Sequence, residues 1–196
     1  MKSTNVTRVA HLVAPDERWR RQGHVGGVMW LTGLPASGKK SLAMALEDRL
    51  FADGFDVYAF DSAHLRLGLS RDLGFSREDR RENIRRAGEL AAVMARAGLV
   101  VITAFISPYA VDREAARTAA QNFHEVFLDV PLEICETRDA ENRYARARAG
   151  ELTDFTGISA PYERPAAPDV TLGADDGLDA WVDQLAAYAA EKFRLS

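Results

Sequence analysis

The stretch WLTGLPASGKKSLAMAL, residues 30–46, decides the fold. It matches the phosphate-binding pattern G-x-x-x-x-G-K-[ST] at Gly33, Gly38 and Lys39, but Lys40 stands where the pattern has Ser or Thr. In such a loop, successive backbone N–H groups and the start of the following helix bind an anionic phosphate. The apolar run before the loop predicts a buried strand, and the helical spacing after it predicts a helix. Strand, loop and helix therefore follow in the order that a nucleotide-phosphate site requires.

Length and composition predict one domain over residues 1–196. The chain is 47% hydrophobic and 28% charged, which supplies enough apolar residues for a core. The net charge of -4 does not favour nucleic-acid binding, and no apolar run reaches the ~18 residues of a membrane span. The single cysteine, Cys135, excludes an internal disulfide, and residues 1–25 form a polar extension without a signal-peptide core. We therefore expect a cytoplasmic protein.

Strand-like and helical stretches alternate along the chain. The expected strands are 26–33, 55–61, 99–105, 124–130 and 169–174, and the expected helices are 38–52, 76–98, 112–123, 131–139 and 178–193. This alternation predicts an α/β fold, a doubly wound parallel sheet with helices on both faces. The most apolar run, 99–105, should be a central strand. Residues 139–168 contain three prolines and two glycines, so they are either a functional lid or a misassigned element.

Candidate ligand-binding residues fall at the expected carboxyl ends of the strands, where such sheets bind ligands. Asp61 ends the second strand, where a carboxylate can accept a proton from a substrate hydroxyl or hold a metal-bound water. A helix N-cap is an equally good interpretation of Asp61. Arg66 and Arg80 offer planar forks for phosphate or sulfate oxygens, and Asn83 shares a helix face with Arg80.

Other candidates are less specific. Ser107 and the backbone beside it could bind a nucleotide edge or form an ordinary turn. Phe75 and Phe155 lie in loop-like segments, where they could sandwich a base or pack in the core. The four histidines have no metal-ligand spacing, so the sequence assigns no metal ligand.

Seven dispersed stretches resemble the adenylyl-sulfate kinase family over about residues 5–173. They are GHVGGVMWLTGLPASGK, RDLGFSREDRRENIRR, GLVVITAFISPY, VFLDVPLEICETRD, ARAGE, FTGISAPYE and PDVTL. Members of that family have P-loop folds, are often homodimers, and transfer the γ-phosphoryl group of ATP to the 3′-hydroxyl of adenylyl sulfate. The resemblance therefore implies a kinase of sulfate assimilation that uses ATP and Mg²⁺ and produces 3′-phosphoadenylyl sulfate and ADP.

The resemblance also implies roles for the matching positions. ATP would be bound by Gly33, Leu34, Pro35, Ala36, Ser37, Gly38, Lys39, Lys40, Ser41 and Arg138. The sulfate-bearing nucleotide would be bound by Arg66, Phe75, Arg80, Asn83, Ile106, Ser107 and Phe155. Lys39 and Asp61 would be catalytic, and residues 139–168 would contain a mobile lid.

Two departures from the family pattern remove groups that would hold Mg²⁺. Lys40 replaces the Ser that binds Mg²⁺, and Ala63 replaces the second acidic residue of the D-G-D-N motif. An ammonium at Lys40 would repel the cation or take its place against the phosphates. Loss of the metal's contribution would lower activity by about a thousandfold if nothing compensates, although Mg²⁺ can still arrive bound to ATP.

Three hypotheses follow. The first is an adenylyl-sulfate kinase, slow or altered in its use of Mg²⁺. The second is a non-catalytic nucleotide-binding protein that acts as a partner or sensor, which Lys40 and Ala63 favour. The third is a kinase of another nucleotide with an anhydride-linked group, which the altered residues 62–64 favour.

Overall fold

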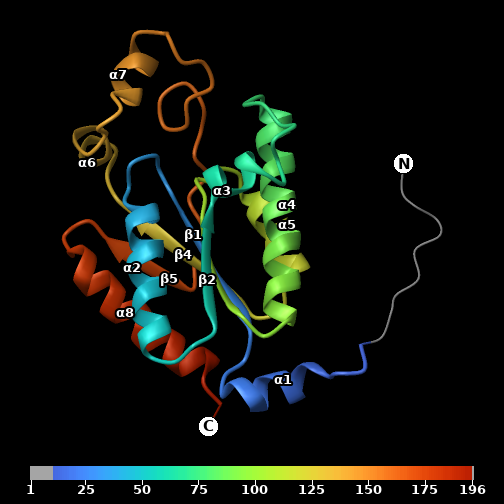
Figure 1. Ribbon diagram of the computed structural model, residues 1–196. Coiled ribbons are helices and arrows are strands. Elements are labelled where there is room, and N and C mark those ends of the chain that lie inside the picture. Colours follow the sequence, from blue (N-terminus) through green and yellow to red (C-terminus); the bar gives the residue numbers. More distant parts are fainter. Residues whose placement is uncertain (1–10, 196) are drawn as a thin grey trace.

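A five-stranded parallel sheet forms the centre of the molecule (Figure 1). The computed structural model describes residues 11–195. Its strands are β1 (Gly27–Gly33), β2 (Val57–Asp61), β3 (Val100–Ala104), β4 (Phe123–Asp129) and β5 (Val170–Gly173). They lie in the order β2-β3-β1-β4-β5, and every neighbouring pair is parallel. The structure thus confirms the predicted α/β class.

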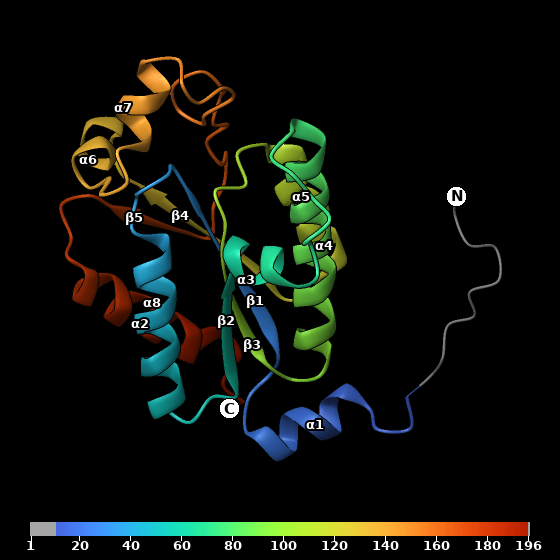
Figure 2. The ribbon, with the colours of Figure 1, turned by 45° about the horizontal axis from the view of Figure 1, so that its top comes forward.

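Helices cover both faces of the sheet. The helices of the described chain are α1 (Pro15–Gln22), α2 (Lys39–Ala52), α3 (Ser62–Leu67), α4 (Arg77–Arg96), α5 (Ala110–Ala119), α6 (Leu132–Thr137), α7 (Arg143–Arg148) and α8 (Leu178–Phe193). Helices α2 and α8 pack on one face, and α4 and α5 pack on the other (Figures 1 and 2). At the carboxyl ends of the strands lie α3, α6, α7 and the segment that follows α7.

Strand β1 lies in the middle of the sheet, and this position explains its sequence. All seven of its residues are buried, and alternate side chains enter two different cores. Met29 and Leu31 face the α2–α8 side, whereas Val28 and Trp30 face the α4–α5 side. Two-sided burial therefore requires the continuous apolar run that precedes the loop.

Most predicted elements agree with the structure, and the exceptions have local causes. The run 99–105 forms β3, which pairs with β2 on one side and β1 on the other and is therefore inside the sheet, as predicted. The helix predicted over 112–123 ends at Ala119, because Phe123 already pairs with Val28 in the sheet and stacks on Trp30. Ser76 caps α4 as predicted, since its hydroxyl accepts a hydrogen bond from the Asp79 N–H.

Three helices were not predicted. Helix α1 lies inside the expected polar extension, of which residues 1–10 are outside the described residues. Helix α3 has six residues and begins directly after β2, while α7 interrupts the expected loop over 139–168. The closing helix α8 has the predicted bounds, and its buried side chains Trp181, Leu185 and Phe193 pack against the domain core.

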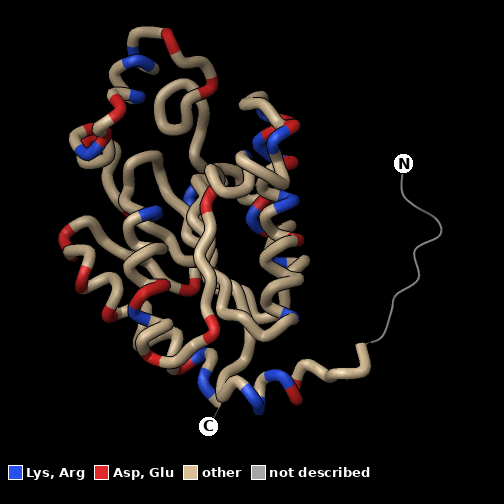
Figure 3. The backbone as a smooth tube through the Cα atoms, in the orientation of Figure 1, with Lys and Arg blue, Asp and Glu red and all other residues tan. Residues whose placement is uncertain are grey.

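Charged side chains lie mainly on the helices and the connecting segments, with both signs interspersed (Figure 3). No described helix combines the length and the apolar character needed to cross a bilayer.

Candidate functional site

The loop between β1 and α2 has the backbone path that a phosphate cradle needs. Gly38 has φ +100° and Gly33 has φ +155°, backbone angles that residues other than glycine rarely adopt. A Cβ atom at Gly33 would come within 2.9 Å of the Leu128 carbonyl oxygen. Helix α2 begins at Lys39, directly after Gly38, so its free N–H groups point into the loop.

Lys39 is held inside this loop. Its Nζ donates hydrogen bonds to the carbonyl oxygens of Gly33 (3.0 Å) and Leu34 (2.7 Å) and to Oγ of Ser37 (3.1 Å). Burial, helped by the positive charge of Arg143, lowers the pKa of Lys39 to about 7. Anionic groups of a ligand bound in the loop would therefore stabilise the charged form of Lys39.

Asp61 lies beside Lys40 at the end of β2 and also caps α3, so the N-cap interpretation is confirmed and the catalytic interpretation stays a prediction. Its Oδ1 accepts a hydrogen bond from the His64 backbone N–H at 3.0 Å, and Nδ1 of the His64 ring lies 3.0 Å from the same oxygen. Its Oδ2 lies 3.4 Å from Nζ of Lys40. Burial alone would raise the pKa of Asp61, but the hydrogen bonds from His64 and the charge of Lys40 outweigh it and lower the pKa. Asp61 is therefore an ionised carboxylate at neutral pH.

A cavity of about 550 Å³ opens beside the loop, between α3, α4, the end of β3 and the segment after α7. All seven residues predicted for the second nucleotide border it: Arg66, Phe75, Arg80, Asn83, Ile106, Ser107 and Phe155. Pro35 of the phosphate-binding loop borders it as well. Residues 89 positions apart in the chain thus surround one space, which adjoins the loop.

Arg66 and Arg80, two of the three arginines that border the cavity, are fixed by backbone carbonyl groups. Nη1 of Arg66 donates to the carbonyl oxygens of Leu73 (3.0 Å) and Gly74 (2.7 Å), and its guanidinium lies 4.4 Å from the centre of the Phe75 ring. Arg80 donates through Nε to the Phe75 carbonyl oxygen and through Nη1 to that of Asp154. Within the part of the chain that the structure describes, Nη2 of both arginines has no hydrogen-bond acceptor.

Asn83 is almost fully buried at the wall of the cavity. Its side-chain nitrogen donates to Oγ of Ser62 at 3.2 Å. Its Oδ1 has no hydrogen-bond partner among the described residues. A buried acceptor without a donor is uncommon, because losing hydration without replacement costs about 1–3 kcal/mol.

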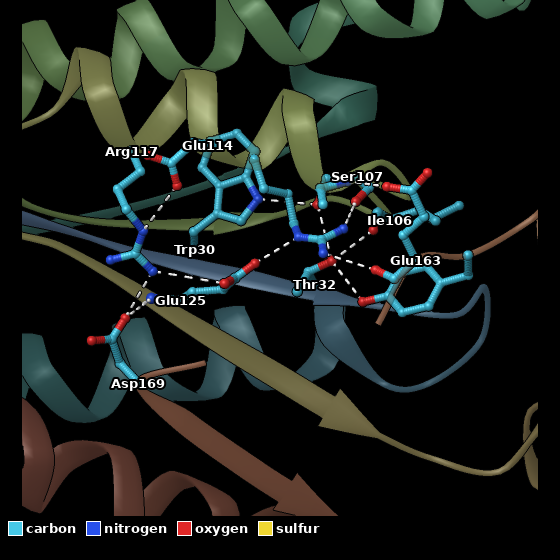
Figure 4. Close-up of polar contacts among 12 residues, drawn as sticks. Trp30, Thr32, Ile106, Ser107, Glu114, Arg117, Glu125, Glu163 and Asp169 are labelled. Carbon is cyan, nitrogen blue, oxygen red and sulfur yellow. Dashed lines mark hydrogen bonds and ion pairs between the residues drawn. The ribbon is translucent and has the colours of Figure 1, made fainter. Parts of the chain in front are cut away.

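Ser107 borders the cavity, but its hydroxyl takes part in a network behind the cavity wall (Figure 4). It accepts from Nε1 of Trp30 at 3.1 Å and donates to Oγ1 of Thr32 at 3.0 Å. Thr32 in turn donates to the Ile106 carbonyl oxygen at 2.8 Å. The Ser107 hydroxyl therefore already has partners in the structure, and its binding of a nucleotide stays a prediction.

A buried arginine, which sequence reasoning missed, supports the same wall. Nε of Arg113 lies 2.6 Å from Glu125, while Nη1 and Nη2 donate to the carbonyl oxygens of Ser107 (2.7 Å) and Glu163 (2.8 Å). Arg113 is 4% exposed, so this ion pair is shielded from water. No local pattern marks Arg113 or Glu125, although Glu163 does end the quoted stretch FTGISAPYE.

The segment over residues 139–168 contacts the phosphate-binding loop and the segment after β3. The hydroxyl of Tyr144 donates to the Pro35 carbonyl oxygen in the loop at 2.9 Å. The backbone N–H of Glu163 donates to the Pro108 carbonyl oxygen at 2.8 Å. Arg138, predicted to lie near ATP, is exposed at the C-terminus of α6 and does not border the cavity.

A parallel sheet, a glycine-bounded loop at the end of its central strand and a lysine at the start of the next helix together define a P-loop protein. The particular family is given by the sequence as a whole. The chain belongs to the adenylyl-sulfate kinase family, because the family model described as Adenylylsulphate kinase matches residues 25–173.

Similar proteins agree with this assignment. The adenylyl-sulfate kinase of Yersinia pestis is 50% identical over 183 residues, which cover 92% of this chain and 86% of that protein. The adenylyl-sulfate kinase of Lactiplantibacillus plantarum is 46% identical over 199 residues, covering 100% and 96%. Among solved structures, the APS kinase of Mycobacterium tuberculosis in complex with AMPPNP and APS has a TM-score of 0.79 and 45% identity, covering 82% of this chain and 95% of that chain.

Proposed function

We propose that this protein transfers the γ-phosphoryl group of ATP to the 3′-hydroxyl of adenylyl sulfate. The observation that carries the proposal is the cavity beside the loop, which is bordered by three arginines, three phenylalanines and an asparagine with an unpartnered acceptor. Two aromatic rings suit an adenine, and two guanidinium groups suit the phosphate and sulfate oxygens attached to it. The M. tuberculosis relative, solved with AMPPNP and APS, supports the same pair of ligands.

In this proposal the two nucleotides meet between the loop and Asp61. The loop residues 33–41 bind the phosphates of ATP, and Lys39 contacts the group that is transferred. Asp61 is ionised and lies at the carboxyl end of β2. It accepts the proton of the 3′-hydroxyl while the oxygen of that hydroxyl bonds to the γ-phosphorus. The bond between that phosphorus and the β–γ bridging oxygen breaks, and ADP leaves. Arg138 approaches ATP from α6, and residues 139–168 close over the site as a lid.

The test follows ADP and 3′-phosphoadenylyl sulfate directly, with ATP, Mg²⁺ and adenylyl sulfate as reactants. We expect turnover well above that of a Lys39→Ala variant, and phosphate transfer to adenylyl sulfate but not to other nucleotides that carry an anhydride-linked group. A matched sample of Lys40→Ser with Ala63→Asp introduces the two groups of the family pattern. If only this double variant turns over, the natural chain binds nucleotides without transferring phosphate.

That second function, a non-catalytic nucleotide-binding protein, is favoured by one specific contact. Lys40 lies 3.4 Å from the carboxylate that the kinase reaction needs as a base. A neighbouring ammonium lowers the basicity of a carboxylate, which slows proton transfer.

Replacing Phe75 tests the stacking role of the cavity. Phe75 is 70% exposed, so Phe75→Ala should leave the unfolding midpoint unchanged. Because stacking of a base on an aromatic ring contributes ~1–3 kcal/mol, we expect the Kd of adenylyl sulfate to rise by about 5- to 150-fold. Calorimetric titration measures this change, and the affinity for ATP should stay the same. Phe51→Ala is the matched control, because Phe51 is 72% exposed on α2 and does not border the cavity. Equal adenylyl sulfate affinity in both variants would contradict the role.

Lys39 predicts a pH dependence of ATP binding. Burial lowers its pKa to about 7 in the free protein, and nearby phosphate oxygens favour the ammonium and so raise that pKa. Above about pH 7, ATP binding must therefore take up a proton, and affinity should fall as the pH rises from there toward 10.5. Below that window both states hold the proton, so this contribution is constant. Calorimetry at about pH 8 in buffers of different ionisation enthalpy should detect an uptake of about one proton, absent in Lys39→Met.

We further propose that the protein acts in the cytoplasm as a homodimer. The hexameric APS kinase of Thiobacillus denitrificans, 27% identical with a TM-score of 0.66, supports self-association within the family, although this chain covers only 31% of that one. Light scattering at micromolar concentration would measure the mass, and a monomer would contradict the proposal.

A further inference from the structure

The two adjacent lysines of the loop have different partners. Lys39 points inward and is bound by the carbonyl oxygens of the loop. Lys40 is the next residue of α2, and its Nζ lies 3.4 Å from Oδ2 of Asp61 across the mouth of the loop. Two ammonium groups therefore lie near the place where the loop would bind phosphate. That of Lys39 is inside the loop, and that of Lys40 is beside the carboxylate of Asp61.

The contact between Lys40 and Asp61 is weak enough to be exchanged. The side chain of Lys40 is 68% exposed, and the distance of 3.4 Å is long for a charge-assisted hydrogen bond. An ion pair of this kind contributes at most about 1 kcal/mol. Lys40 can therefore leave Asp61 for a phosphate oxygen at little cost in stability.

The residues of this site do not fit a divalent cation. Position 40 supplies an ammonium where the loop pattern supplies a hydroxyl ligand, and Ala63 supplies no oxygen. Both oxygens of Asp61 already have partners, His64 on one side and Lys40 on the other. Across residues 11–195, the structure has no group of three metal-ligating side chains.

We propose that Lys40 is itself the cation of this site, so that the protein binds a nucleoside triphosphate without needing a divalent metal. On binding, the ammonium of Lys40 moves from Asp61 toward the phosphate oxygens, where it neutralises charge beside Lys39. This inference rests on the ATP site of the proposed function, but it concerns how ATP is bound and not which molecule accepts its phosphate.

The experiment compares ATP affinity in excess Mg²⁺ and in excess EDTA, by calorimetric titration of the full-length protein without adenylyl sulfate. For the natural protein we expect the two Kd values to agree within about threefold. For Lys40→Ser we expect Kd in EDTA to rise at least about tenfold above its value in Mg²⁺, because the hydroxyl restores a metal ligand while the built-in charge is lost. Lys40→Arg keeps the charge and should behave like the natural protein.

Lys192→Ser is the matched control, since it makes the same substitution on α8 and should leave both Kd values unchanged. Unfolding midpoints of all variants check that the exposed substitutions leave the fold intact. A natural protein whose Kd rises tenfold or more in EDTA overturns the inference, as does a Lys40→Ser variant whose metal dependence equals that of the natural protein. Because no acceptor is present, failure of adenylyl sulfate to accept phosphate would refute the proposed function and leave this result unaffected.

Discussion

Lys39→Met is expected to lower kcat/KM for phosphoryl transfer by about a thousandfold. The substitution keeps the length of the side chain and removes one charge next to the transferred phosphoryl group, where an ion pair at an effective dielectric constant near 20 is worth ~4 kcal/mol. Each 1.36 kcal/mol corresponds to a factor of ten in rate. The folded structure should persist, since burial already disfavours the charged form of Lys39. Initial rates of ADP formation, with circular dichroism as a check on folding, measure the effect.

Lys40 cannot replace Lys39 in this role. The two side chains leave α2 in different directions, one to the carbonyl oxygens of Gly33 and Leu34 and the other to Asp61. Lys192→Met, far from the loop on α8, should retain the natural rate and serves as the control. A loss smaller than about tenfold in Lys39→Met would contradict the role of Lys39 and would mean that another cation, such as Lys40, stabilises the transferred group in its place.

Arg113→Met is expected to lower the free energy of unfolding by about 3–5 kcal/mol. Arg113 and Glu125 form a buried ion pair at 2.6 Å, and removing the arginine leaves a carboxylate that is only 8% exposed. The carbonyl oxygens of Ser107 and Glu163 would each lose a donor as well. Arg117, 3.7 Å from the same carboxylate, offsets part of the loss, which places the expected value near the lower limit. Urea unfolding followed by fluorescence measures the change.

A double variant separates charge from packing in this prediction. Arg113→Met with Glu125→Leu removes both members of the pair and should recover most of the lost stability, because well-packed apolar residues often replace a buried ion pair without loss. Arg85→Met is the matched surface control. Arg85 pairs with Glu82 at 2.7 Å on the solvent-facing side of α4, and its loss should cost no more than about 1 kcal/mol. If Arg113→Met costs no more than Arg85→Met, the buried network does not stabilise the fold.

The same network explains why Ser107 was difficult to interpret from sequence. A serine after an apolar strand looks available to a ligand, yet its hydroxyl is bonded to Trp30 and Thr32, residues 77 and 75 positions away. Likewise, Arg113 lies in an unremarkable helical stretch, and its three partners come from β4 and from two separate loops. Side-chain partners this distant along the chain leave no periodic signal.

The sequence by itself determined the five strands, the loop and the described helices other than α1, α3 and α7. A continuous apolar run, the 3.6-residue spacing of apolar side chains and the glycine pattern are local properties, so the buried strand β1, the helix α2 and the glycines that bound the loop could be recognised within a short window. The carboxyl ends of parallel strands lie at one edge of the sheet, which predicted that Arg66, Ile106 and Ser107 lie near the loop. The resemblance to adenylyl-sulfate kinases implied the other cavity residues, Phe75, Arg80, Asn83 and Phe155.

Only the tertiary structure decided the electrostatics of the site. The capping of α3 by Asp61, the contact of that carboxylate with Lys40 and the burial of Lys39 depend on how β2, α2 and the loop are placed in three dimensions. Charge interactions vary with distance and with exposure to water, and neither can be computed from the order of residues alone. A lysine in place of a serine is therefore a single change in the pattern, but its effect depends on the carboxylate that the fold brings beside it.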